Sequence, residues 1–406
     1  MTNPVLIAAV EGGGTSFVVA VAEFFPGNEN GSNIRVLHRD EVDSSNDNPE
    51  KTLEECATFF RKHKNISENG YAALGVGMFG PLGCNPEIKK EYGTILPTTP
   101  KKSWRGVDVL SPLVAACECE SKTNTQRKLA VKIDTDVNAP AVAEYLSERR
   151  QNDEQRTKKI SSLAYVTVGT GVGVGLVIHG QPVHGRMHPE GGHVPVHPLE
   201  GDAFTGYSWG ANSKSPFKGK HTVESMTSSV ALTERLEQLQ KEGTASATTK
   251  LNRDCLANLK NDDHEVWDHA ANALANLCVT LALVTSVEKI VLGGGVMKRN
   301  GLIGKVRNQT RVLLNGYLGD MSDRDLSEWV TSSRHGSDAG LIGALSLAQQ
   351  AIAEQNEEIV VAVDSSKKLK QRAYGAGVWH GFVLGLSAAY IGLILYTRSG
   401  RSSSRR

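Results

Sequence analysis

Two acidic residues, Asp134 and Asp136, stand where an apolar run gives way to a helical pattern, in the stretch 131–143 (VKIDTDVNAPAVA). Asn138 suits the cap of the helix that follows, and Pro140 fits its first turn but not a helix interior. A carboxylate held at such a strand end can take the proton of a hydroxyl group as that oxygen attacks a phosphoryl group. We therefore assign the role of general base to Asp136. The alternative is that both acids only end a strand and cap a helix, because short motifs have low specificity.

Glycine-rich turns follow three short apolar runs, at residues 12–14, at residues 169–173 and at Gly293–Gly295. Glycines at such turns let backbone N–H groups approach a phosphate with no Cβ in the way. At the first two turns a second apolar run follows, which predicts a strand–turn–strand hairpin. Two copies of one hairpin, one in each half of the chain, indicate duplicated domains that close on a nucleotide. The alternative for the first turn is a tight turn that needs positive φ angles.

Histidines and cysteines supply the candidate metal ligands. Five histidines lie close together in the sequence, with Glu190 three residues before the fourth: His179, His184, His188, His193 and His197. They offer imidazole ligands, and the alternative is a surface loop whose histidines make hydrogen bonds. The six cysteines lack the spacing of a disulfide framework, which indicates a reduced compartment. Cys117 and Cys119 form a CxC that we interpret as two ordinary thiols, because no partner pair lies nearby.

Length and charge exclude some classes of protein. At 406 residues the chain exceeds what one hydrophobic core normally supports, so two domains are expected. The 45 basic residues nearly balance the 44 acidic ones, for a net charge of +1, so nothing points to a nucleic-acid partner. The first residues contain no basic region leading into a long apolar one, so no secretory signal is predicted.

Apolar runs alternate with helical patterns along the chain, which predicts an α/β fold. The predicted strands are residues 4–10, 17–25, 72–79, 131–133, 163–168, 174–178 and 289–292. The predicted helices are residues 51–64, 225–241, 263–285 and 336–353. The helix over 263–285 is strongly apolar, so we expect it to be buried.

Taken together, these stretches resemble the ROK family of sugar kinases and sugar-responsive repressors, and within it the bacterial-type fructokinases. The resemblance spans residues 5–353 and is carried by an ordered set of segments: VEGGGTSFVVAV, FGPLGCNP with YGTILPTTPKKSW, DTDVNAPAVAE, TVGTGVGVGLVIHGQPVHGRMHPEGGH, KIVLGGGVMKRNGLIGKVRNQTRVLLNGYL and GSDAGLIGALSLA. It implies an actin-like fold of two ribonuclease-H-like domains, with ATP and the sugar in the cleft between them. The implied lobes are residues 1–133 and 134–336, and the helix over 337–353 is expected to return to the first lobe.

The resemblance also implies roles for single residues. Asp136 matches the family's catalytic base. The implied ATP-binding residues are Gly13, Gly14 and Thr15 in a first phosphate loop, Thr167, Gly169, Thr170 and Gly171 in a second, and Gly293, Gly294 and Gly295 beside the adenine and ribose. The implied sugar contacts are Asn138, Glu190, His193, Glu224, Gly80 and Pro81. Residues 99–104 correspond to the family's TPKxGW loop, which favours the fructokinases over the glucokinases. The implied reaction is the ATP- and Mg²⁺-dependent phosphorylation of fructose to fructose 6-phosphate.

Two positions depart from the family pattern. Ser16 stands where the family normally has a lysine after Gly-Gly-Thr, so one positive charge near the phosphates is missing and Mg²⁺ is expected to compensate. The family's structural zinc takes the histidine aligned with His193 and cysteines downstream, but no cysteine lies between His193 and Glu224. Zinc with cysteine ligands is therefore not expected there, and a site built from His193, His197 and His221 stays an alternative.

The chain continues beyond the region of resemblance. Residues 377–397 (GVWHGFVLGLSAAYIGLILYT) contain no Asp, Glu, Lys or Arg, and as a helix they would reach about 30 Å, enough to cross a bilayer. We predict a C-terminal membrane anchor there, with a linker at 354–376, a basic tail at 398–406 and the kinase facing the cytosol. The alternative is a buried helix of a larger core. The sequence does not define the organelle, and it leaves a homodimer open.

Other functions compete with the fructokinase hypothesis. A broader hexose or mannose kinase would use the same glycine turns and base. A membrane-bound sugar sensor without turnover would account for Ser16 and the missing zinc cysteines, although the retained Asp136 argues against it. A repressor is not expected, because the sequence opens directly on the phosphate hairpin with no room for a preceding DNA-binding domain.

Overall fold

The computed structural model describes residues 3–27, 33–44, 47–118, 128–150, 159–208, 214–243, 254–259 and 262–375. The chain divides into two compact units, Met1–Ala351 and Ile352–Arg406. Both β-sheets lie in the first unit, which therefore holds all of the candidate site.

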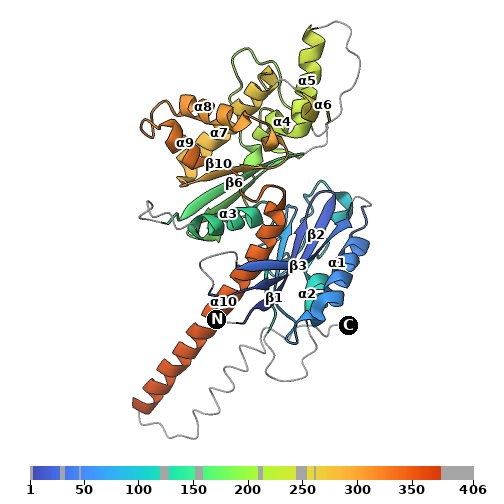
Figure 1. The fold of residues 1–406 in the computed structure, drawn as a ribbon, viewed down its shortest axis with the longest axis vertical. Helices are drawn as coiled ribbons and strands as arrows, with labels where there is room; N and C mark the ends of the chain where they lie inside the picture. The colour runs from blue at the N-terminus through green and yellow to red at the C-terminus, as the bar shows by residue number, and fades with distance from the viewer. Residues whose placement is uncertain are drawn as a thin grey trace. The chain divides into compact units, whose positions relative to one another are not determined.

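The first sheet has the strand order β3-β2-β1-β4-β5, and Figure 1 labels three of its strands, β1, β2 and β3. Its strands are β1 (Val5–Gly12), β2 (Ser16–Phe24), β3 (Ile34–Asp43), β4 (Tyr71–Met78) and β5 (Ala130–Thr135). The pairs β1–β2 and β2–β3 are antiparallel, whereas β1, β4 and β5 run parallel. The predicted N-terminal hairpin is thus confirmed.

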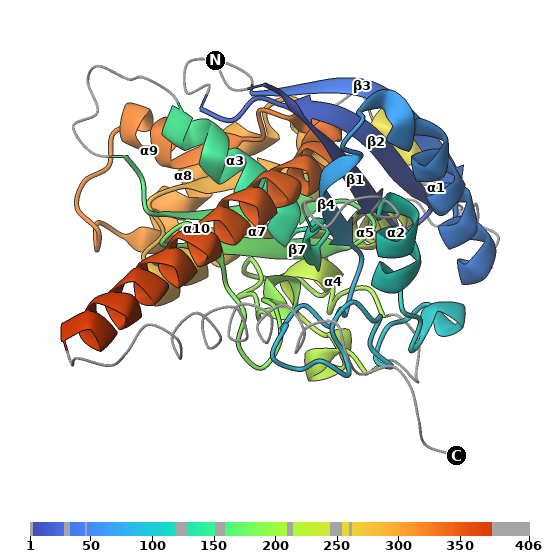
Figure 2. The same cartoon turned by 90° about the horizontal axis from the view of Figure 1, so that it is seen from below.

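Helices cover both faces of this sheet. On one face, α1 (Pro49–His63) packs against α2 (Leu110–Cys117), and Leu53 and Phe60 of α1 share a core with Val10 and Leu74. Helix α1 begins where the sequence favours a helix start, because the side chain of Asn48 accepts a hydrogen bond from Lys51 N and Pro49 occupies the first turn. On the other face lies the beginning of α10 (Ala339–Gly375), and Figure 2 shows this start on the opposite side of β1 from α1 and α2.

The second sheet repeats the topology of the first, with the order β10-β9-β6-β7-β8. Its strands are β6 (Ser162–Val168), β7 (Val172–Ile178), β8 (Gln181–Pro182), β9 (Ile290–Gly293) and β10 (Val330–Ser332). An antiparallel run β6–β7–β8 again joins a parallel run β6–β9–β10. The predicted duplication of an α/β unit is therefore borne out by the strand pairing.

Helices also sandwich the second sheet. Helix α3 (Asn138–Arg150) packs on β6 and β7, and α7 (Glu265–Thr285) packs with α8 (Leu302–Leu314) over a separate core. Most of α7 is buried, as its apolar sequence predicted. The remaining α-helices are α4 (Val223–Thr227), α5 (Ser229–Gly243), α6 (Asp254–Asn258) and α9 (Asp323–Trp329). Short 3-10 helices span Lys64–Ile66, Lys102–Trp104, Gly191–His193, Pro216–Gly219, Val296–Lys298 and Gly336–Asp338.

Two predicted elements differ from the structure. The single helix expected over 225–241 is broken at Ser228, whose extended backbone (φ −61°, ψ 157°) ends α4 before α5 begins. The last predicted helix, 336–353, begins as a 3-10 turn and then continues as α10 to Gly375, so most of the expected linker 354–376 is helical. The lobe boundaries at residues 133 and 336 stay predictions.

The predicted membrane localisation is contradicted. Within the part of the chain that the structure describes, no helix is both long and apolar enough to cross a membrane. Helix α10 has the length, with 37 residues, but its second half carries charges such as Glu354, Glu357 and Glu358. The segment 377–397, on which the anchor and the cytosolic orientation rested, lies outside the described residues.

Glycines allow helix α10 to lie directly on its neighbours. A Cβ added at Gly75 of β4 would lie 1.9 Å from Ala344 O and 2.5 Å from Ala348 N, both in the backbone of α10. A Cβ added at Gly343 of α10 would lie 2.4 Å from the carbonyl carbon of Ala139 in α3. The start of α10 is therefore packed between β4 of the first sheet and α3, which covers the second.

We predict that Gly75→Ala destabilises the protein by about 1–3 kcal/mol, because the added methyl group must push the backbone of α10 away from β4. Gly304→Ala in α8 is the control: an added Cβ there meets nothing within 4 Å, and alanine is favoured in a helix. Chemical denaturation of both variants measures the effect. Equal stability of Gly75→Ala and the wild type would contradict the packing of α10 against the sheet.

Candidate active site

The carboxyl ends of β1, β4 and β5 meet at one edge of the first sheet. Gly12 pairs with Met78, and Met78 pairs with Thr135. Two further backbone hydrogen bonds extend this edge: Phe79 N donates to Gly12 O (2.9 Å) and Asp136 N donates to Met78 O (2.9 Å). The first glycine turn, the segment after β4 and the predicted base Asp136 are therefore brought together.

The other two glycine turns meet at the corresponding edge of the second sheet. Thr167 pairs with Gly293, which aligns the ends of β6 and β9. Gly169 N donates to Gly171 O (2.9 Å), which closes the turn between β6 and β7. Gly294 has φ +89°, and a Cβ there would lie 2.4 Å from Val168 O, so only glycine fits between the two turns.

Each of the three turns has a glycine beside open space. An added Cβ would meet no atom within 4 Å at Gly14, Gly169 or Gly295. In the first turn, Gly13 N donates to Ser16 O (3.0 Å), and Ser44 N donates to Thr15 O (3.1 Å). The turns are thus held by their own backbone and leave room beside it, as a phosphate-binding loop requires.

Asp136 lies among charged groups from both lobes. Its side chain is half-buried, and burial raises its pKa to about 6. The charge of Glu190 raises this pKa further, whereas His188 and Lys101 lower it. Glu190 and His188 belong to the loop after β8, and Lys101 to the loop between β4 and α2. The structure thus brings the predicted base close to both of these loops.

The predicted sugar-binding residues Glu190 and His193 are neighbours in the structure. Glu190 Oε1 lies 3.0 Å from His188 Nε2, and its Oε2 lies 4.0 Å from His193 Nε2. Glu224 contacts the second glycine turn, where its Oε2 accepts a hydrogen bond from Val172 N (3.0 Å), and its sugar contact stays a prediction. The structure therefore groups Glu190 with His193 and links Glu224 to the hairpin β6–β7.

Gly80 and Pro81 lie between the loop of His188 and Glu190 and the TPKxGW-like loop. They are joined by a cis peptide bond, and Gly80 O accepts a hydrogen bond from Thr99 Oγ1 (3.2 Å). A Cβ at Gly80 would lie 3.2 Å from His188 Nε2, so this glycine lets the two lobes approach closely. The buried Trp104 packs against Phe79 and so fixes the position of the loop 99–104.

Lys101 is a charged residue of the site that the sequence analysis did not single out. Its Nζ hydrogen-bonds to Gly14 O in the first glycine turn and lies 4.4 Å from the centre of the Phe79 ring. Burial lowers the pKa of Lys101, while the carboxylates of Asp47 and Asp136 act in the opposite direction. The only signal in the sequence was its place in the segment TTPKKSW.

Asp134 and Asn138 form a buried, hydrogen-bonded pair close to Asp136 in the sequence. Asn138 Nδ2 donates to Asp134 Oδ1 (2.8 Å), and Asn138 Oδ1 accepts from Leu176 N (3.2 Å). The residue that caps α3 is Thr135, whose Oγ1 accepts from Asn138 N (3.0 Å). In the structure the side chain of Asn138 thus makes contacts within the protein, and its sugar contact stays a prediction.

The histidine-based metal alternative is not formed. Among the described residues, the group of side chains placed to share a metal ion is Cys84, Asp134 and His184, and it contains none of His193, His197 and His221. Burial, followed by the negative charge of Asp134, raises the pKa of the Cys84 thiol. Sequence reasoning missed this group because its members are far apart in the chain.

Glu11 is a second residue that the sequence analysis did not assign. Its carboxylate reaches the start of α10, where it accepts a hydrogen bond from the backbone of Leu341. Burial raises the pKa of Glu11 to about 7, the charges of Asp136 and Asp338 raise it as well, and Arg39 lowers it. The three carboxylates of Glu11, Asp136 and Asp338 therefore lie near the first glycine turn, and the positive charge of Arg39 neutralises them only in part. The sequence offered one signal for this residue, since Glu11 comes directly before the glycines of the first turn.

Two lobes of one topology, each with a glycine turn at the carboxyl edge of its sheet, define a two-domain α/β fold of the actin-like class. A solved structure supports this: the ROK hexokinase from Thermus thermophilus superimposes with a TM-score of 0.62 at 22% identity, covering 86% of this chain and 99% of that one. At this identity the similarity establishes the fold alone.

Sequence comparison then gives the family. The model of the ROK family matches residues 7–351, so the chain belongs to the ROK family. A fructokinase from Zymomonas mobilis is 32% identical over 345 residues, which are 84% of this chain and 96% of that protein. A fructokinase from Pediococcus pentosaceus is 30% identical over 349 residues, 86% of this chain and 99% of that protein. The predicted relationship to the ROK fructokinases is confirmed.

We predict that Glu11→Gln stabilises the ligand-free protein at pH 8 by about 1–3 kcal/mol. The folded-state pKa of Glu11 lies above its unfolded value. Its contribution to stability is therefore complete below about pH 4.5 and is lost as the pH rises through about 7. The neutral glutamine avoids this loss, so the difference between variant and wild type should shrink toward zero at pH 5.

Urea denaturation at pH 5 and pH 8 measures this difference. Glu41→Gln, on the exposed edge strand β3, is the control and should show no such change between the two pH values. A stability difference that is the same at both pH values for Glu11→Gln would contradict the assignment of a buried, repelled carboxylate.

Proposed function

We propose that the protein is an ATP-dependent fructokinase that transfers the γ-phosphoryl group of Mg-ATP to the 6-hydroxyl of fructose. The observation that carries the proposal is the position of Asp136, at the carboxyl edge of the first sheet and beside the loop of Glu190. The similarity over most of the chain to proteins named fructokinase supports the choice of sugar.

In this proposal Asp136 is the general base. A phosphoryl group is transferred to an oxygen that must lose its proton, and a fixed carboxylate within hydrogen-bond reach takes that proton. Glu190 and His193 hold hydroxyl groups of the sugar, since a carboxylate and an imidazole side by side offer both acceptors and donors. Asp134 is excluded from the role of base because its side chain is fully buried and hydrogen-bonded to Asn138.

The glycine turns fit a bound nucleotide. The open space beside Gly14, Gly169 and Gly295 is what a phosphate or ribose needs at a backbone, and these positions come from both lobes. When bound with ATP, Mg²⁺ would neutralise charge on the transferring phosphoryl group. The carboxylate of Glu11 would hold this cation, since it adjoins the first turn and the negative charges of Asp136 and Asp338 lie nearby.

Lys101 replaces the charge that is missing at Ser16. The family's lysine would follow Thr15 in the chain, whereas Lys101 reaches the carbonyl of Gly14 from a different loop. It also lies close enough to Asp136 to affect that residue's pKa. A cation between the phosphate turn and the base is placed to stabilise negative charge as the phosphoryl group moves.

A hexose panel tests the proposed function. With Mg-ATP, the full chain should phosphorylate fructose with a kcat/KM about tenfold or more above that for glucose and mannose. Asp136→Asn should lower kcat by about three orders of magnitude and leave fructose binding nearly unchanged. A preference for glucose would reject the fructokinase assignment. Wild-type turnover as low as that of Asp136→Asn would instead favour a sugar-binding protein without catalysis.

We predict that Lys101→Met lowers kcat by about 100-fold with a small change in the KM for fructose, because it removes charge stabilisation of the transition state. Lys102→Met is the matched control, since Lys102 is the exposed neighbour in the same loop. Steady-state kinetics separates the two parameters. A raised KM with unchanged kcat would show that Lys101 only supports the loop.

A further inference from the structure

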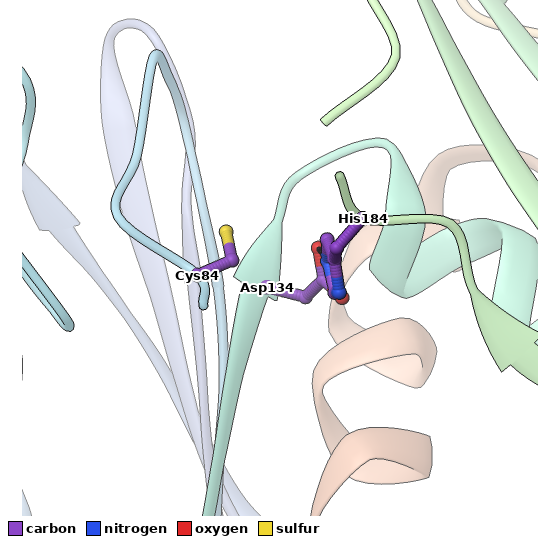
Figure 3. Close-up of side chains that lie close together, drawn as sticks. All are labelled: Cys84, Asp134 and His184. Carbon is purple, nitrogen blue, oxygen red and sulfur yellow. Dashed lines mark hydrogen bonds and ion pairs between the residues drawn. The ribbon is translucent and has the colours of Figure 1, made fainter. Parts of the chain in front are cut away.

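Three side chains that carry metal-binding atoms meet beside the candidate active site. Cys84 comes from the loop after β4, Asp134 from the end of β5 and His184 from the loop after β8, and Figure 3 shows them together. Their ligand atoms all lie within 4.8 Å of one another. Cys84 and Asp134 are buried, and 27% of the His184 side chain is exposed.

The carboxylate of Asp134 is oriented by its protein partners. Its Oδ1 accepts hydrogen bonds from Asn138 Nδ2 (2.8 Å) and from Thr135 N (2.8 Å). Its Oδ2 is fully buried and lies 3.0 Å from His184 Nε2, and the same nitrogen lies 3.1 Å from Oδ1. The thiol of Cys84 also interacts with this carboxylate, so both neighbouring ligand side chains converge on Asp134. Buried charges in proteins are paired or coordinate metals, and both residues beside Asp134 carry metal-binding atoms.

We propose that Cys84, Asp134 and His184 bind a zinc-type divalent cation with one open coordination position. Thiolate, imidazole and carboxylate are ligands of Zn²⁺, whereas Mg²⁺ prefers oxygen alone, so this site is distinct from that of the nucleotide's metal. On binding, the thiol proton leaves to solvent and a metal–sulfur bond forms, with no change of oxidation state. Asn138 acts from the outer shell and fixes the carboxylate.

The geometry is close to that of a zinc site. Ligand atoms of a tetrahedral zinc lie about 3.5 Å apart, since Zn–S is about 2.3 Å and Zn–N about 2.0 Å. Cys84 and His184 also line a surface pocket together with Leu82, Ile88, Met187 and His188, which leaves room beside the group for water or a ligand oxygen.

Such an ion would join the two lobes next to the reacting groups. Cys84 and Asp134 belong to the first lobe's sheet edge, and His184 precedes His188 and Glu190 in the loop from the second lobe. Asp134 lies two residues before Asp136 on the same strand end. The ion would therefore hold the loop of Glu190 against the strand of Asp136. It lies away from the family's zinc position at His193, where this chain lacks the cysteines.

Metal titration of the chelator-treated full chain, without sugar or nucleotide, tests the proposal. Calorimetry with Zn²⁺ should give one equivalent per chain, and Co²⁺ should give a thiolate-to-cobalt charge-transfer band. Cys84→Ser and His184→Ala should each weaken Zn²⁺ binding by about 100-fold, and Cys84→Ser should abolish the band. The controls are Cys255→Ser and His179→Ala, which lie outside the group and should bind as the wild type does.

Two results would overturn the proposal. One is a wild-type chain that takes up no Zn²⁺ at micromolar concentration, a measurement that does not depend on the folding of any variant. The other is unchanged binding by Cys84→Ser and His184→Ala, which would place the metal on other residues. Because no kinase assay is involved, a failure here is distinguishable from a failure of the proposed function.

Discussion

Two backbone hydrogen bonds, from Phe79 N to Gly12 O and from Asp136 N to Met78 O, organise the candidate active site. They carry the pairing of β1, β4 and β5 one residue beyond the strands, so the first glycine turn, the segment at Gly80 and Asp136 leave the sheet side by side. Parallel strands all end at the same edge, so any side chain that follows them is close to the others. The second lobe repeats this arrangement with the turns after β6 and β9.

The start of α10 connects this edge to the rest of the fold. The helix lies on β4 at Gly75 and on α3 at Gly343, where a side chain would collide with backbone. Its first turn receives the carboxylate of Glu11, and a helix N-terminus favours a negative charge. The packing that joins the lobes and the electrostatics beside the first glycine turn therefore depend on the same segment.

Charge around Asp136 is balanced by residues from separate loops. Lys101 approaches from the first lobe and His188 with Glu190 from the second, and each of them shifts the pKa of Asp136. Because these groups are held by different loops, a change in the distance between the loops would change the charge balance at Asp136. A metal ion bound by Cys84, Asp134 and His184 would restrain the distance between these loops.

The sequence by itself determined the local structure and the family. Glycine turns between apolar runs predicted both hairpins, periodicity predicted α1 and α7, and the end of the run VKIDTD placed an acid at a strand terminus. These features depend on neighbours within a few residues, which propensity and periodicity describe. The break at Ser228 and the extension of α10 to Gly375 were missed because tertiary packing overrides such local preferences.

Only the tertiary structure decided which distant residues meet. The contact of Lys101 with Gly14 joins positions 87 residues apart, and that of Asp134 with His184 joins positions 50 residues apart. The tertiary structure also distinguished the two acids, since Asp134 is fully buried and hydrogen-bonded to Asn138 and His184, whereas Asp136 is half-buried among the charges of Lys101, His188 and Glu190. No local pattern encodes such pairings, because they arise when the sheet edge and the loops from two lobes are brought together by folding.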